Sequence, residues 1–290
     1  MSKSDYLMEK RLKELNPELH KRFTDAVFGL QNILTNYRNL FPWYTDHSAL
    51  HSMTVLNYGN QILGVDSISK LNADEIYIFI MACYFHDTGM GISKKDFEEF
   101  SEKIDFGDYF ETHAKDDYVN IVRSFHHEFS GEFIKKYSSV FDFPSPEHEF
   151  AVVNVARGHR KTDLFNEVEY PKSLALYNGN TINMPYLAAV LRLADEMDVA
   201  EDRNIGMTDA FKQSGGDFQI MEYAKHDAIQ KVSVTHDAFI FDVDTVDEKV
   251  RQGITELAEK IQDTLDYCVL TVEKQTPYEI TQRKIILNWM

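Results

Sequence analysis

The first forty residues carry hydrophobic side chains at helical spacing. Leucine, phenylalanine and valine recur every three or four positions from residue 5 to residue 40, across a break at Pro17. Such a stripe is typical of amphipathic helices whose apolar face covers a core. The sequence therefore predicts one or two helices here, and the stretch from Phe41 to Tyr44, with its proline, interrupts the pattern.

A further helix is predicted to begin at Thr45 or Asp46, because either side chain can cap a helix start. This helix carries His51 and continues to about residue 63. Residues 64–72 are expected to form a connector.

Residues 76–85 are apolar on every face, and this run ends at His86-Asp87. The length favours a buried helix, with a central strand as the alternative. Adjacent residues on a regular helix point about 100° apart, so these two side chains can share one site only if the helix is distorted. Thr88-Gly89, with Gly91, allows such a distortion.

The middle of the chain alternates between irregular and helical patterns. Residues 93–117 are acidic and aromatic with poor periodicity, which indicates a peripheral insertion or lid. Helices are predicted at about 119–137 and 147–159, and another has Pro185 in its first turn. Residues 160–181 are expected to be irregular.

Beyond Arg203 the periodicity changes. Residues 230–235 and 239–243 alternate with a period of two, which predicts a β-hairpin. A long helix over 247–272 and a final strand over 278–287 are expected to follow. The predicted fold is mainly α: a helical domain of residues 1–205 with a small C-terminal α+β appendage of residues 206–290.

Composition narrows the classes of function. The net charge of −17 disfavours broad binding to nucleic acids or to anionic membranes, both of which need a basic surface. Two cysteines among 290 residues support neither a disulfide framework nor a cysteine-rich zinc site. The charged start lacks the apolar centre of a signal peptide, and no run reaches transmembrane length. We expect a cytoplasmic protein with no membrane partner.

Histidine and aspartate residues lie in or at the ends of the predicted core helices. The candidates are His51, His86, Asp87, His126 or His127, His159 and Asp195. Imidazole and carboxylate ligands suit divalent metals such as Mn, Fe, Ni, Zn or Mg. Such an ion lowers the pKa of bound water and polarises a phosphoryl oxygen. The pattern therefore indicates hydrolysis of a phosphate ester with one or two metal ions per chain.

Four motifs between residues 45 and 205 resemble the HD superfamily of metal-dependent phosphohydrolases. They are Asp-His-Ser-Ala-Leu-His at 46–51, His-Asp-Thr-Gly at 86–89, His-His-Glu-Phe-Ser-Gly at 126–131 and Leu-Arg-Leu-Ala-Asp-Glu-Met-Asp at 191–198. The resemblance implies a core of about five helices. It also implies that His51, His86, Asp87 and Asp195 bind a metal ion, and that Asp87 helps to orient the attacking water.

Members of this family with a second ion add a histidine from the next helix and another after it. Counting back from Ser130-Gly131 selects His126, and its helical phase agrees, with His127 as the alternate. His159 would be the other added ligand. His47 is either a residue that orients a ligand or a surface histidine, and Asp198 either supports the fold or binds Arg203.

Arg160 and Lys161 follow His159 directly, and arginine offers paired donors suited to phosphate. We expect these two residues to contact the substrate.

The resemblance also separates this chain from two well-known groups. Met90 stands where the HD-GYP phosphodiesterases place lysine, and the segment after Asp87 does not match the alarmone hydrolases. The predicted activity is hydrolysis of a phosphomonoester or phosphodiester, with a nucleotide as first candidate, by attack of metal-bound hydroxide. The alternative is a nucleotide-binding regulatory or interaction module that keeps the metal without turnover. A homo-oligomer formed through the C-terminal segment is also expected.

Overall fold

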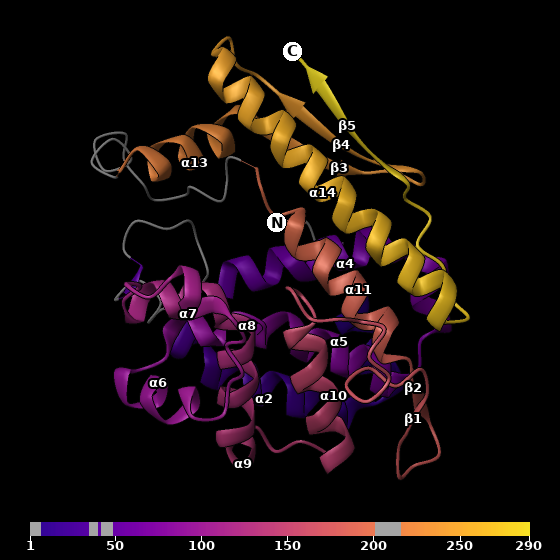
Figure 1. Cartoon of the computed structure of the whole chain (residues 1–290). Coiled ribbons are helices and arrows are strands. Elements are labelled where there is room, and N and C mark those ends of the chain that lie inside the picture. The colour runs from indigo at the N-terminus through magenta and orange to yellow at the C-terminus, as the bar shows by residue number, and fades with distance from the viewer. Residues whose placement is uncertain (1–6, 35–39, 42–48, 201–215) are drawn as a thin grey trace.

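The computed structural model describes residues 7–34, 40–41, 49–200 and 216–290 (Figure 1). His47, the predicted capping residues Thr45 and Asp46, and Arg203 lie outside these ranges. The described chain is mainly helical with small sheets, which confirms the predicted fold class.

The helical body lies within the described residues up to 200. Its elements are α1 (Leu7–Leu15), α2 (Pro17–Leu34), α4 (Ala49–Lys70), α5 (Ala73–Phe85), the 3-10 helix η1 (Thr88–Gly91), α6 (Lys94–Ser101), α7 (Tyr109–Thr112), α8 (Tyr118–Lys136), α9 (Ser138–Phe141), α10 (Pro146–Arg157), the short strands β1 (Leu174–Ala175) and β2 (Thr181–Ile182), and α11 (Met184–Glu196). The predicted break at Pro17 falls at the start of α2, and Pro185 lies in the first turn of α11, as predicted.

Helix α5 lies at the centre of the body. It contacts α1, α2, α4, α10 and α11, and all its residues from Ile76 to Phe85 are buried. This surrounding explains why the run is apolar on every face, and it excludes the alternative of a strand. A capping box begins the helix: the Asn72 side chain accepts from the Glu75 backbone N–H, and the Glu75 carboxylate accepts from the Asn72 N–H.

The predicted connector at 64–72 is wrong. Helix α4 continues to Lys70 after a kink at Gly64, whose φ of 65° lies in the left-handed region that glycine adopts without steric cost. Gly64 therefore lies at a bend within α4 and not at the end of the helix.

The aromatic side chains of the 93–117 segment pack on α8. The ring centroids of Phe97 and Phe129 are 5.4 Å apart, and Phe106 and Tyr109 lie 4.9 and 5.0 Å from Phe125. These contacts attach α6 and α7 to the body through α8. A role for the segment as a lid stays a prediction.

The C-terminal part contains α13 (Asp217–Ala228), β3 (Ile229–Val234), β4 (Ala238–Val243), α14 (Glu248–Gln275) and β5 (Lys284–Trp289). The predicted hairpin and long helix are confirmed, and the final strand begins six residues later than expected. The sheet order is β3-β4-β5, with β3 and β4 antiparallel and β5 parallel to β4. Helix α14 packs on both α11 and β5, and so links this sheet to the helical body (Figure 1).

Among the described residues, no helix combines the length and apolar character needed to cross a membrane.

Candidate functional site

The end of α5 brings His86 and Asp87 to one site. His86 closes the helix with helical φ/ψ, whereas Asp87 leaves it at φ −103° and ψ 8°, directly before η1. This change of backbone direction is the distortion that the sequence predicts. Both side chains can therefore face the same cluster although they are adjacent in the chain.

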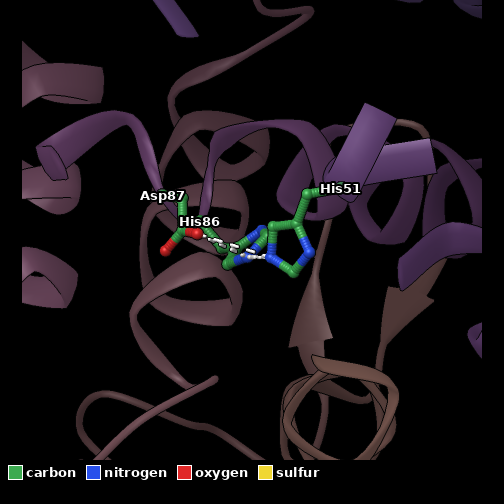
Figure 2. Close-up of side chains that lie close together, drawn as sticks. All are labelled: His51, His86 and Asp87. Atoms are coloured by element: carbon green, nitrogen blue, oxygen red, sulfur yellow. Dashed lines mark hydrogen bonds and ion pairs between the residues drawn. The ribbon is translucent and has the colours of Figure 1, made fainter. Parts of the chain in front are cut away.

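His51 of α4 and His86 form a first histidine pair, with 3.1 Å between their Nε2 atoms (Figure 2). Asp87 Oδ2 lies 3.4 Å from each of these nitrogens. Asp195, from the last turn of α11, places Oδ1 3.2 Å from His51 Nε2 and 3.6 Å from His86 Nε2. Three segments far apart in sequence thus supply four ligand-type side chains.

His126 of α8 and His159, which follows α10, form a second histidine pair with 3.0 Å between their Nε2 atoms. Asp87 Oδ1 is 3.5 Å from His126 Nε2 and 3.8 Å from His159 Nε2. The two oxygens of Asp87 therefore face different pairs. One carboxylate lies between two groups of candidate ligands, as expected of a residue that bridges two ions.

In each of these four histidines, Nδ1 forms a hydrogen bond to an oxygen atom. His86, His126 and His159 donate to the backbone carbonyl three residues earlier, at 2.9, 2.8 and 2.6 Å. His51 Nδ1 is 2.5 Å from Asp198 Oδ2. Because a carbonyl oxygen only accepts, Nδ1 carries the proton, and the Nε2 of a neutral ring faces the cluster as a lone pair.

This arrangement fits divalent ions. Two lone pairs about 3 Å apart repel each other unless a proton or a cation lies between them. Two nitrogens that bind one ion at right angles, each at about 2.1 Å, are separated by about 3 Å. Two sets of three residues could each hold an ion: the first is His51, His86 and Asp87, and the second is Asp87, His126 and His159. Within each set, one candidate ligand atom from each residue lies within 4.8 Å of the others. The donor set, imidazole with carboxylate, suits first-row metals.

The two histidine pairs differ in their electrostatics. Burial lowers the pKa of His86, but Asp87 and Asp195 raise it further, so that it reaches about 9. At the second pair burial dominates: it lowers the pKa of His126 to about 3 and that of His159 well below its usual value. Without metal, the first pair thus holds a proton at neutral pH and the second pair is neutral.

Helix α8 packs closely against η1, and this contact places His126 beside Asp87. A Cβ atom on Gly89 would lie 2.1 Å from the His126 carbonyl oxygen, so only glycine permits this contact. Ser130 ties the two segments, since its Oγ accepts from the Gly89 N–H and donates to the His86 carbonyl. Phe125, directly before His126, has non-helical φ and ψ of −120° and 17°, which locally bends α8.

The structure separates the roles of the adjacent histidines. His126 Nε2 faces His159 and Asp87, as helical phase predicts. His127 is also buried, but its Nε2 lies 3.6 Å from Glu128, and its Nδ1 has no hydrogen-bond partner within the described chain. His126 is therefore the member of the pair that lies in the cluster.

Arg160 and Lys161 line a cavity of about 340 Å³ that also includes His159. The charge of Arg160 contributes to the lowered pKa of both His126 and His127. Two other arginines near these motifs have partners within the protein. Arg157 forms a bidentate pair with Glu128, at 2.9 and 2.8 Å, and Arg192 donates to the carbonyls of Gly158 and Thr162.

The sequence leaves the role of Asp198 open, and in the structure its carboxylate contacts His51. Asp195 lies in the last turn of α11, and Asp198 lies just past the end of that helix. Asp195 faces the Nε2 of His51 and Asp198 its Nδ1. The spacing was the available signal, but it could not tell which nitrogen each carboxylate would meet.

Comparison with known proteins identifies the family. Searches among curated proteins and among solved structures gave no match. A family model described as HD-CE matches residues 41–275, a range that contains every candidate ligand and α14. Because this match covers most of the chain, the protein belongs to the HD-CE family and contains an HD-type domain.

Proposed function

We propose that the protein is a metal-dependent phosphohydrolase that cleaves a phosphomonoester or a phosphodiester, with a nucleotide as the first candidate substrate. His51, His86, Asp87 and Asp195 would hold one ion, and His126, His159 and Asp87 would hold a second. Ions at these positions would polarise a phosphoryl oxygen and lower the pKa of water beside them.

The chain's own residues define the remaining steps. Asp87, located between the two pairs, would orient the attacking water. The water gives up a proton and its oxygen forms a bond to phosphorus, the bond from phosphorus to the leaving oxygen breaks, and the leaving oxygen takes up a proton in its place. Arg160 and Lys161 would contact the substrate from the cavity beside His159.

The observation that carries this proposal is the position of Asp87 between two histidine pairs. Its two oxygens lie 3.4 to 3.8 Å from four Nε2 atoms. Without a cation, the neutral second pair would leave two lone pairs facing each other at 3.0 Å, and the first pair would need a proton between nitrogens 3.1 Å apart. A site for two cations accounts for both distances.

Metal analysis and turnover test the proposal together. Purified protein should contain at least one equivalent of divalent ion, and His86→Ala should lose it. With added manganese, phosphomonoesters, phosphodiesters and nucleotides should be screened, and turnover should disappear in Asp87→Ala. His236→Ala, in an exposed turn, is the matched control and should retain metal and activity.

Two outcomes would redirect the proposal. Wild-type protein that binds no divalent ion would refute it. Protein that binds metal and nucleotides but turns over no member of the panel would instead favour a regulatory or interaction module.

A further inference from the structure

The cavity beside His159 is built by two distant parts of the chain. One side is the segment 159–161, which follows α10, and the other is α14 with Lys260, Thr264 and Tyr267. Arg192 and Glu196 of α11 complete the lining with Asp263. Since His159 belongs to both the second histidine pair and this cavity, the cavity adjoins the candidate metal site.

The cavity is cationic in a strongly acidic protein. Four cationic side chains line it against two carboxylates, whereas the chain has a net charge of −17. Lys260 pairs with Glu196 at 3.2 Å, and Arg192 donates to backbone carbonyls. An anion entering the cavity would therefore meet positive charge that the protein has not neutralised.

The positive charge that is not neutralised belongs to Arg160 and Lys161. Their side chains take part in no hydrogen bond or ion pair within the part of the chain that the structure describes. Arg160 is partly buried, so its guanidinium has lost part of its hydration without gaining a protein partner within the described residues. A phosphate group matches this donor in geometry and charge.

The segment carrying these two residues is fixed on both sides. Arg192 Nε donates to the Gly158 carbonyl at 2.7 Å, and its Nη2 donates to the Thr162 carbonyl at 2.8 Å. Tyr267 of α14 accepts the Leu164 N–H at 2.8 Å, and its ring lies beneath the Arg192 guanidinium, 5.2 Å away. The cations are thus presented by an anchored segment, which reduces the entropy cost of binding.

We propose that this cavity binds a second phosphate group of the substrate, next to the phosphate that reacts between the histidine pairs. Arg160 and Lys161 bind this group, and Tyr267 is a positioning residue that acts through their segment. The substrate class is a phosphate ester with at least two phosphates, either contiguous, as in a nucleoside diphosphate, or separated by a nucleoside, as in a dinucleotide. This inference rests on the proposed function.

Kinetics on substrates with one and two phosphates test the proposal. The manganese-loaded protein is assayed with p-nitrophenyl phosphate, AMP, ADP and the linear dinucleotide pApA. Arg160→Ala should raise the KM of ADP or pApA by about tenfold or more, as expected for a lost charged hydrogen bond, and that of p-nitrophenyl phosphate by less than about threefold. Whichever two-phosphate substrate responds identifies the contiguous or the separated arrangement.

Matched variants separate contact from fold. Tyr267→Phe removes the hydroxyl and keeps the ring, so it should raise the KM of ADP or pApA by a smaller factor than Arg160→Ala does, and change KM more than kcat. Lys274→Ala, exposed on α14 and outside the cavity, should change neither. Equal effects of Arg160→Ala on one-phosphate and two-phosphate substrates would overturn the proposal.

A binding experiment keeps the test independent of turnover. If wild-type protein hydrolyses none of the panel, the proposed function fails, and calorimetry with inorganic pyrophosphate then examines the cavity alone. Binding that Arg160→Ala weakens by about tenfold and Lys274→Ala leaves intact supports a phosphate site. Wild-type protein that does not bind pyrophosphate, or binds it as well as Arg160→Ala does, refutes that site.

Discussion

Asp198 Oδ2 lies 2.5 Å from Nδ1 of His51, on the opposite side of the ring from the candidate metal site. A carboxylate in this position fixes the ring orientation and makes the inward nitrogen a stronger ligand. The neighbouring Asp195 meets that inward nitrogen directly, at 3.2 Å. The end of α11 therefore supplies a candidate ligand and, just past the helix, the residue that orients another.

Asp198→Asn should weaken metal binding by about 10-fold to 100-fold, because it removes the negative partner of His51 and keeps the side-chain shape. Manganese affinity, measured by competition with a chelating dye, provides the readout. Asp244→Asn, at an exposed aspartate, is the control and should leave the affinity unchanged. Equal affinity of Asp198→Asn and wild type would show that His51 needs no such partner.

Metal binding should depend on pH through His86. Its pKa of about 9 in the metal-free protein means that a proton occupies the first pair at neutral pH and must leave when an ion binds. Affinity should therefore rise by up to about tenfold per pH unit as the pH approaches 9, and fall as the solution is acidified. Calorimetry in buffers of different ionisation enthalpy should detect close to one proton released per ion at the first pair.

His126→Ala removes a ligand of the second pair, so that proton release at the first pair can be measured by itself. It leaves His51, His86, Asp87 and Asp195 in place, so the remaining ion should still release a proton. Affinity that stays constant between pH 6.5 and pH 8.5 would contradict the assignment of the proton to His86.

Gly89→Ala should separate α8 from η1. The new methyl group would collide with the His126 carbonyl at 2.1 Å, and backbone atoms on both sides leave little room to relax. We expect a loss of stability of about 1–3 kcal/mol and a selective loss of the second metal equivalent, because His126 would move. Denaturation and metal analysis measure the two effects.

Gly29→Ala is the matched control for this substitution. Gly29 lies in α2, and an added Cβ would contact nothing within 4 Å. Alanine should therefore stabilise the helix by about 0.5–1 kcal/mol. If Gly89→Ala were as well tolerated, the close approach of α8 to η1 would not determine the second site.

Most helices of this fold could be predicted because their apolar stripes are local. The run from Ile76 to Phe85 indicates a buried helix without any knowledge of its neighbours. Gly64 shows the limit: a glycine predicts a left-handed φ, but whether the helix resumes afterwards depends on packing beyond it. The late start of β5 has the same cause, because its parallel pairing with β4 involves residues far apart in sequence.

In the candidate site, too, some features could be predicted from local sequence and others depend on packing between distant segments. The positions of His86 and Asp87 follow from a helix end, and His126 follows from helical phase. The sharing of Asp87 between two histidine pairs, and the contact of Asp198 with His51, depend on how α4, α8 and α11 meet. The cavity formed with α14 could not be predicted from the sequence for the same reason, since Tyr267 lies 103 residues after its partner Leu164.

The packing of α14 leads to the last prediction. Ile261, Leu265 and Cys268 are fully buried on this helix, which contacts α11, the helix that carries Asp195. Leu265→Ala should therefore cost about 2–5 kcal/mol and lower the stability of the helical body and the C-terminal part together. Leu270→Ala, on the same helix but 47% exposed, should cost much less.

The number of unfolding transitions then decides how the chain is organised. If residues 1–205 and 206–290 were separate domains, denaturation followed by two probes would give two transitions, and Leu265→Ala would shift only one of them. Because α14 covers α11 and holds the segment after His159 through Tyr267, we expect a single transition that Leu265→Ala moves as a whole. Metal affinity should fall in parallel, since the candidate ligands Asp195 and His159 lie on or beside the elements that α14 supports.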